Sequence, residues 1–166
     1  VREHIPVPSI PEDTNWTPML KLVLYPDKRL NKFCRPVKEF NEELEEQVRL
    51  MIATMYGYGG IGLAANQVGY TNRVIIVARD PTTYPKTTPL VLINPRLRHR
   101  SNKKQTMNEG CLSFPGKTIY RRRSQKIRLI AQNLDGTEFK WQASGLAAQC
   151  LQHEIDHING RTFLDK

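Results

Sequence analysis

Apolar residues recur with a helical period in the segment that follows Asn41. They are spaced at i, i+4, i+7, i+8 and i+11, and they are Leu44, Val48, Met51, Ile52 and Met55. This spacing places them on one face of a helix that packs against a core. Asn41 suits the N-cap, and Glu42 and Glu43 fall in the first turn, where acidic side chains are favourable. The pattern predicts an amphipathic helix that ends at the glycines beginning with Gly59.

Two short runs are apolar almost throughout and predict buried strands, RVIIVA at residues 73–78 and PLVLINP at residues 89–95. The segments IRLIAQNL and TEFKWQ flank Asp135 and Gly136, a pair that strongly favours a β-hairpin turn. Strands and helices do not alternate regularly along the chain. The expected fold is therefore α+β, with small antiparallel or mixed sheets packed around a C-terminal helix and one amphipathic helix nearer the N-terminus.

The C-terminal helix is expected from about Ser144 to Asn159, with Gly160 ending it in the C′ position. One face carries Leu146, Cys150, His153 and His157, at i, i+4, i+7 and i+11. The two histidines belong to an HExxH motif, HEIDH at residues 153–157, and lie one turn apart. This is the geometry of two ligands to one metal ion, with Glu154 as a candidate proton carrier.

The third ligand of a catalytic site of this type is expected upstream of the helix. Asp165 is the sole acid after His157, and Phe163 stands where the long metzincin signature has its third histidine. Asp156, inside the motif, points roughly 100° away from His157 around the helix. It is expected to orient one of the imidazoles rather than to bind the ion.

Four upstream side chains are candidates, namely His4, His99, Cys34 and Cys111. Cys111 is favoured because Gly110 before it allows the backbone to approach a metal closely. Cys150 lies on the motif helix itself and suits the wall of a pocket better. A lone cysteine is usually a small buried hydrophobe, and HExxH also occurs in helices that bind nothing. From these residues alone, Cys111 is the preferred third ligand, and the other candidates stay open.

A third segment, GGIGLAANQVG at residues 59–69, has its glycines too close together for a helix interior. It lacks both GK[ST] and a complete GxGxxG, so a phosphate loop is not indicated. It is either a plain glycine-rich turn after a helix or a loop whose backbone binds an extended substrate. In the second case the Gln67 amide is a candidate hydrogen-bond donor.

The segments GIGLAANQ (60–67), EGCLS (109–113) and HEIDH (153–157), in this order, resemble the three motifs of the peptide deformylase family. The resemblance implies hydrolysis of the formyl group from the N-formylmethionine of newly made proteins, with release of formate. It implies that Cys111 is the third metal ligand, beside His153 and His157. It also implies that the Gln67 side chain and the Leu112 backbone N–H stabilise the oxyanion.

The chemistry expected of such a site needs one divalent metal ion. The resemblance implies Fe²⁺ as the native ion, whereas the ligand types alone favour Zn²⁺, and Ni²⁺ or Co²⁺ could also bind. An ion with one open position activates water for attack on the formyl carbon. Glu154 is expected to take the water proton and deliver it to the leaving amine. Because one missing oxyanion donor costs about 10² to 10³ in rate, Gln67→Ala is expected to fold but to be nearly inactive.

Substrate binding is expected in two places. The backbone of Gly60, Ile61 and Gly62, together with that of Gly110, should pair with the peptide as an added strand. The methionine side chain should enter a pocket formed by Met107, Leu146, Cys150 and the carbon stem of Gln149. Gln149 departs from the family pattern, which usually has an aliphatic residue at this position, so the shape of the pocket is left open.

Two alternatives belong to other functional classes. A zincin-like metallopeptidase would share HExxH but would need neither Gln67 nor EGCLS, and it would cleave peptides without a formyl group. A structural metal module would need a fourth protein ligand, and it would not explain Glu154.

The chain has 166 residues and a mass of 19.1 kDa, which indicates one catalytic domain at residues 19–166 after a leader at residues 1–18. No apolar run approaches the roughly 18 residues that span a membrane. Three cysteines without a framework spacing favour a reducing compartment. We expect a monomer in the cytoplasm, bacterial or phage-encoded. The alternative is a plastid or mitochondrial enzyme without its transit peptide.

The net charge is +9, and basic residues cluster at residues 96–104 and 121–123. Solvated strand faces are the favoured explanation, and Glu109 is expected to pair with one arginine of the second cluster. A weak electrostatic contact with ribosomal RNA is the alternative. Because aromatic residues are not interleaved with the charges, specific nucleic-acid recognition is not expected.

Overall fold

The computed structural model describes residues 3–6, 18–83 and 89–165. Its α-helices are α1 (Glu42–Gly57) and α2 (Gly145–Ile158). Its strands are β1 (Gly62–Ala64), β2 (Val74–Ala78), β3 (Pro89–Arg100), β4 (Lys104–Gly110), β5 (Thr118–Ser124), β6 (Lys126–Gln132) and β7 (Glu138–Ser144). Three short 3₁₀ turns are η1 (Lys28–Asn31), η2 (Ala65–Val68) and η3 (Pro81–Thr83). No helix in these ranges is both long and apolar enough to cross a membrane.

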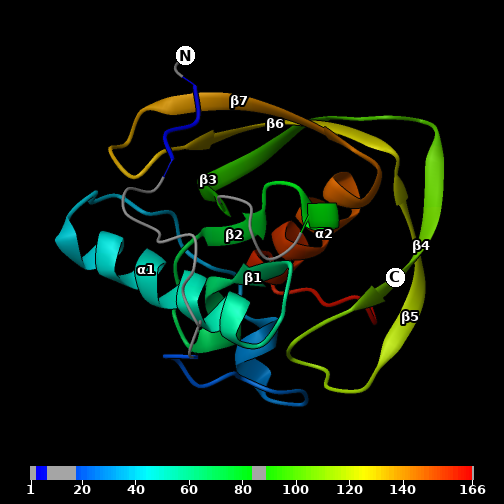
Figure 1. Ribbon diagram of the computed structural model, residues 1–166, viewed down its shortest axis with the longest axis horizontal. Helices are drawn as coiled ribbons and strands as arrows, with labels where there is room; N and C mark the ends of the chain where they lie inside the picture. Colours follow the sequence, from blue (N-terminus) through cyan, green and yellow to red (C-terminus); the bar gives the residue numbers. More distant parts are fainter. Residues whose placement is uncertain (1–2, 7–17, 84–88, 166) are drawn as a thin grey trace.

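The strands form two antiparallel sheets, which agrees with the α+β fold expected from the sequence. A five-stranded sheet has the order β1-β2-β3-β6-β7, and β4 pairs with β5 in a separate two-stranded ribbon. Figure 1 shows α2 lying between the large sheet and this ribbon, while α1 lies on the opposite side of β1 and β2. The helix that carries HExxH is therefore central.

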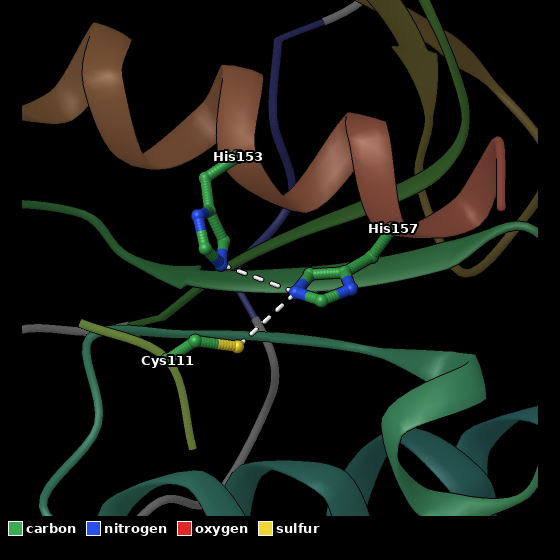
Figure 2. Close-up of side chains that lie close together, drawn as sticks. All are labelled: Cys111, His153 and His157. Carbon is green, nitrogen blue, oxygen red and sulfur yellow. Dashed lines mark hydrogen bonds between the residues drawn. The ribbon is translucent and has the colours of Figure 1, made fainter. Parts of the chain in front are cut away.

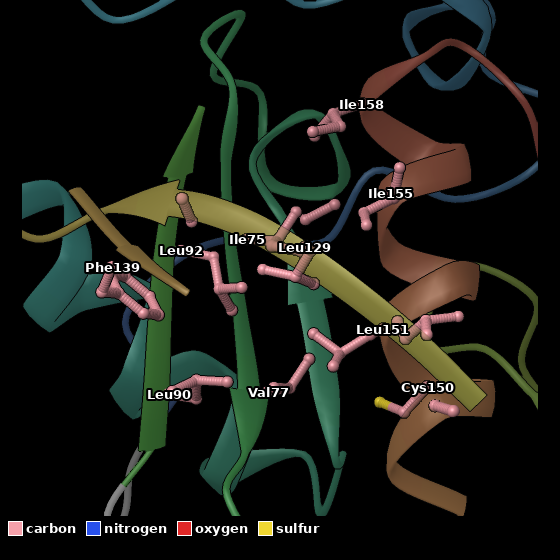
Figure 3. Packing of buried hydrophobic residues seen from close by; sticks show 14 of the residues in the cluster. Ile75, Val77, Leu90, Leu92, Leu129, Phe139, Cys150, Leu151, Ile155 and Ile158 are labelled. Atoms are coloured by element: carbon pink, nitrogen blue, oxygen red, sulfur yellow. The ribbon is translucent and has the colours of Figure 1, made fainter. Parts of the chain in front are cut away.

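The first half of the large sheet is buried on both faces. On β2, Ile75 and Val77 belong to the apolar cluster that includes α2, whereas Val74 and Ile76 belong to the cluster that includes α1. Figure 3 shows the first cluster, in which side chains of α2 such as Ile155 face β2 and β6. Burial on both faces explains why this strand is apolar at every position rather than at alternate ones.

Helix α1 begins and packs as its apolar stripe predicts. The Asn41 side chain accepts a hydrogen bond from the Leu44 N–H at 3.1 Å, so it is the N-cap. The five residues of the stripe are all buried. They fix α1 against the sheet beside the glycine-rich segment that follows it.

The second half of the large sheet is covered on one face only. β6 and β7 alternate buried and exposed residues and are joined at Asp135 and Gly136, where Gly136 has a φ of +86°. The predicted hairpin is therefore present. Leu129 on β6 packs toward α2, and its neighbour Arg128 is exposed.

Three parts of the fold differ from expectation. β3 continues into the basic run as far as Arg100, and β4 and β5 form a ribbon that the apolar pattern did not predict. Only Glu109 on β4 is fully buried, so the strand lacks a clear apolar alternation. Cys34, one of the upstream candidates for the third ligand, is 1% exposed and packs in the core with Ile158 and Ala64.

The expected leader lies largely outside the described residues, but residues 3–6 are attached to the large sheet by hydrogen bonds. His4 Nε2 accepts a hydrogen bond from the Val91 N–H on β3 at 3.3 Å, and its ring stacks edge-on against Phe139. The Ile5 N–H donates to the Asn133 side chain at 2.8 Å. These residues therefore lie beside β3 and the hairpin of β6 and β7. His4 is thus a structural residue and not a metal-ligand candidate.

Candidate metal centre

Helix α2 presents its two histidines from a well-anchored C-terminal end. Gly160, with a φ of +76°, ends the helix in the predicted position, and a Cβ there would lie 2.6 Å from the backbone oxygen of Asn31. The Asn66 side chain donates to the His157 carbonyl at 2.6 Å. Arg73 donates to the Ile158 carbonyl at 3.1 Å. The last turn of the helix is therefore fixed to the segment between β1 and β2.

Cys111 reaches the histidines from the loop that follows β4. Its Sγ lies 3.3 Å from His157 Nε2, which in turn lies 3.1 Å from His153 Nε2 (Figure 2). In a tetrahedral centre with usual metal–nitrogen and metal–sulfur bonds, such atoms are roughly 3.4 to 3.6 Å apart. Among the described residues, these three are the one group of His, Cys, Asp or Glu that could hold a metal ion. Sulfur and imidazole donors at these separations fit one divalent ion.

Glu109 orients His153. Its Oε1 lies 2.8 Å from His153 Nδ1, and Arg123 donates to the same carboxylate at 2.5 and 3.0 Å. Burial would raise the pKa of Glu109, but the hydrogen bonds from His153 and Arg123 lower it to about 2. The charged carboxylate therefore holds Nδ1 as the donor, which leaves the Nε2 lone pair for a metal.

The role expected of Asp156 was wrong. Its carboxylate accepts a hydrogen bond from Arg123 at 2.7 Å and, within the described residues, makes none with either imidazole. The predicted pairing of Glu109 with an arginine of the second basic cluster is confirmed, and the arginine is Arg123. The sequence did not indicate that this ion pair also holds a metal ligand.

Glu154 is buried beside the three ligands, with 4% of its surface exposed. Burial, more than any other influence, raises its pKa to about 7. Its Oε1 has no hydrogen-bond partner among the described residues. A carboxyl group whose pKa lies near neutrality, with one oxygen unpaired, is suited to accept and return a proton.

The Gln67 side chain is held rigidly at the end of β1. Its Oε1 accepts from the Ala64 N–H at 2.9 Å, while its Nε2 donates to Ser113 Oγ at 3.1 Å. The same Nε2 lies 3.4 Å from Cys111 Sγ. The amide N–H group is thereby directed toward the metal centre. The part that Ser113 has in this orientation could not be predicted from the sequence.

A cavity of about 880 Å³ opens over the centre. Its lining includes most of the residues predicted to bind substrate, and these are Gly60, Ile61, Gly62, Gly110, Leu146, Gln149 and Cys150, together with the predicted oxyanion residue Leu112. Glu154, Gln67, Cys111 and His153 also line it. Met107 does not belong to this lining and lies on β4 opposite Arg121. His99 lies on the exposed half of β3, on the rim of a separate hollow.

Comparisons with known proteins give one consistent result. A family model described as polypeptide deformylase matches residues 19–166. Curated peptide deformylases from Wigglesworthia glossinidia brevipalpis and Hydrogenovibrio crunogenus are 40% identical over 147 residues and 43% identical over 148 residues. These matches cover 89% and 88% of this chain, and 94% and 84% of the relatives. The solved peptide deformylase from Thermotoga maritima matches with a TM-score of 0.83 and 35% identity, over 89% of this chain and 97% of that one.

Proposed function

Because this chain belongs to the peptide deformylase family, we propose that Cys111, His153 and His157 hold its catalytic metal ion and that Glu154 carries the proton. The protein is a metal-dependent hydrolase that removes the formyl group from the N-formylmethionine of newly made proteins. The observation that carries the proposed roles is the convergence of three ligand atoms, from two distant segments, beside a buried glutamate. We treat residues 19–166 as one catalytic domain.

The Glu154 carboxylate accounts for both proton transfers in the reaction. When bound, the divalent ion supplies a Lewis acid and lowers the pKa of water toward neutrality. Glu154 accepts a proton from the attacking water, whose oxygen forms a bond to the formyl carbon. The carbon–nitrogen bond then breaks, and Glu154 returns the proton to the leaving nitrogen. The products are formate and a free methionine amino group.

Gln67 and Leu112 stabilise the oxygen of the formyl group as it gains negative charge. One Gln67 N–H donates to Ser113 and fixes the amide, so the other N–H is already directed toward Cys111 and the centre before the reaction. The Leu112 backbone N–H follows the ligand Cys111 directly and lies beside the same cavity. Gln67→Ala should lower kcat by about 10² to 10³ while metal content and melting temperature stay near those of the wild type. Loss of the metal from this variant would instead indicate a structural role for the amide.

The peptide backbone is recognised by residues 60–62 and by Gly110, which border the cavity from β1 and β4. β1 is an edge strand of its sheet, so one side of it is free to pair with an added strand. The methionine side chain enters the part of the cavity next to Leu146, Gln149 and Cys150. We leave Met107 out of this pocket because it lies outside the cavity lining.

We propose Fe²⁺ as the native ion, as the resemblance of the motifs implies, with Zn²⁺, Ni²⁺ or Co²⁺ as possible substitutes. A thiolate and two imidazoles suit both iron and zinc, so the ligand set does not separate them. Activity of anaerobically prepared Fe²⁺ protein that decays in air, with a slower but air-stable Zn²⁺ form, is the expected result. Equal rates and equal air stability for the two forms would contradict iron as the better ion.

We further propose a weak electrostatic contact with ribosomal RNA. We expect the protein to be a monomer in the bacterial cytoplasm or, alternatively, in an organelle. Exposed cations gather on β3 and β6, and they are Arg96, Arg98, Arg100, Lys126 and Arg128. Among the described residues, the acid that pairs with this set is Glu138, 3.7 Å from Arg96. Co-sedimentation with ribosomes should fall steeply with salt. Absence of binding even at low ionic strength would exclude the contact.

A further inference from the structure

The amide group of Gln149 is entirely occupied by a polar network behind the cavity wall. Its Nε2 donates to the Glu109 carboxylate and, at 2.9 Å, to the Arg121 carbonyl. Its Oε1 accepts from Gln105 Nε2 at 3.1 Å. Both N–H groups and the oxygen are thus in use, so what remains to line the cavity is the methylene stem.

The contact with Glu109 connects Gln149 to the metal centre. The Glu109 carboxylate receives four donors, two from Arg123 and one each from His153 and Gln149. A carboxylate has about four acceptor positions, so the set is complete. Without the Gln149 donor, one acceptor position of a buried carboxylate would lack a partner, and Arg123 and His153 alone would hold the group. A shift of the carboxylate toward a new partner would move the atom that orients His153.

We propose that Gln149 is a positioning residue that fixes the Glu109 carboxylate, and through it the His153 ring, while its stem forms part of the methionine pocket. The inference rests on the proposed function in one respect, namely that His153 is a metal ligand. An aliphatic residue at this position could form the same wall but could not donate to Glu109. In this chain, the shape of the side-chain pocket and the orientation of a metal ligand therefore depend on one side chain.

Gln152 offers a matched control on the same helix. It is also a buried glutamine, and its Nε2 donates to the backbone oxygens of Ser124 and Ala148 at 2.9 and 3.0 Å. In the described structure it makes no hydrogen bond to Glu109. Replacing Gln152 removes a buried amide of the same kind without touching the carboxylate that orients His153.

The test compares the wild type with Gln149→Leu, Gln149→Met and Gln152→Leu, each loaded with Co²⁺. The rate at which an excess of chelator removes the cobalt is measured, together with the visible spectrum of the bound ion. Changes behind a metal ligand typically weaken binding by about 10- to 100-fold. Since Gln149 acts through Glu109, we expect cobalt loss roughly tenfold faster in both Gln149 variants, with a changed spectrum. Gln152→Leu should stay within about twofold of the wild type.

Two results would overturn the inference. Wild-type rates of cobalt loss in both Gln149 variants would mean that Gln149 only forms part of the pocket wall. A change confined to KM for the methionine substrate would support the same conclusion. Equal acceleration by Gln152→Leu would indicate a general packing effect. Gln149→Met keeps an unbranched side chain of similar length, so the test stands even if Gln149→Leu does not fold.

The result is separable from the proposed function. A wild-type cobalt spectrum without a thiolate-to-metal absorption band would contradict Cys111 as a ligand before any variant is made. Cobalt loss requires no turnover of a formyl peptide, so the inference about Gln149 can hold or fail whatever the rate of deformylation.

Discussion

Glu154 has room beside the metal ligands because residue 62 has no side chain. A Cβ on Gly62 would lie 2.5 Å from Glu154 Oε2 and 2.8 Å from Cys150 Sγ. Both distances are shorter than real Cβ atoms tolerate, so either the carboxylate or β1 would have to move. The glycine is required for this close approach and not for an unusual backbone angle.

Gly62→Ala should therefore displace Glu154 while leaving the three metal ligands in place. A displacement of about 1 Å at a reacting group can cost about 10² in rate, and we expect a fall of this size in kcat. Formate release and bound metal are measured on the same samples. In a double-mutant cycle, Gly62→Ala should add little further loss to Glu154→Gln. Full additivity of the two losses would mean that Gly62 acts elsewhere.

At the residue scale, the proposed ligands could be predicted because spacing on a helix determines which side chains share a face. HExxH placed His153 and His157 together, and the resemblance of EGCLS to a family motif added Cys111. The role predicted for Asp156 was wrong because helical spacing does not show which side chain of a neighbouring strand will pair with it. Arg123, from β5, binds the carboxylates of both Asp156 and Glu109, and it is Glu109 that orients His153.

At the scale of elements, the two helices were predictable and the ribbon of β4 and β5 was not. α1 and α2 have apolar stripes with N-caps or terminal glycines at their ends. β4 and β5 are short, mostly exposed, and rich in charged and polar residues, so they lack the alternation that identifies a half-buried strand. The loop between them carries Cys111.

Residues 3–6 also behave as an element, and their attachment should depend on pH. The pKa of His4 is lowered from 6.5 to about 4, first by burial and then by the charge of Arg79. Between these values the unfolded chain binds a proton that the folded chain does not. The contribution of His4 is therefore complete above about pH 6.5 and is lost as the pH falls toward 4.

The prediction is checked by the denaturant midpoint of the wild type and of His4→Gln at several pH values from 7 to 4.5. The wild type should lose stability more steeply than the variant over this window. Parallel curves for the two proteins would show that His4 is not held in its neutral form.

At the scale of the whole molecule, the metal ion would link the two sheets through α2. Cys111 follows the β4 strand, while both histidines belong to the helix that packs on the large sheet. An ion that binds the folded protein but not the unfolded chain, at a free concentration 1,000 times its Kd, raises the free energy of unfolding by about 4 kcal/mol. For a chain of this size, that corresponds to a rise in Tm of roughly 10 °C.

Removal of the metal by a chelator should accordingly lower the Tm by roughly this amount, and Zn²⁺ should restore it. Cys111→Ser should have a lower Tm than the wild type with metal, and it should respond less to added Zn²⁺. An unchanged Tm on removal of a stoichiometric ion would contradict a centre that joins the two sheets.

The measurement that tests the central claim most directly is formate release from a formyl-Met-Ala-Ser peptide. Wild type and Glu154→Gln are prepared anaerobically with Fe²⁺, and their metal content is measured on the same samples. The account predicts release by the wild type and a loss of about 10² to 10⁴ in Glu154→Gln with the metal retained. Near-wild-type release by Glu154→Gln, or cleavage of the unformylated peptide instead, would contradict the roles given to this centre.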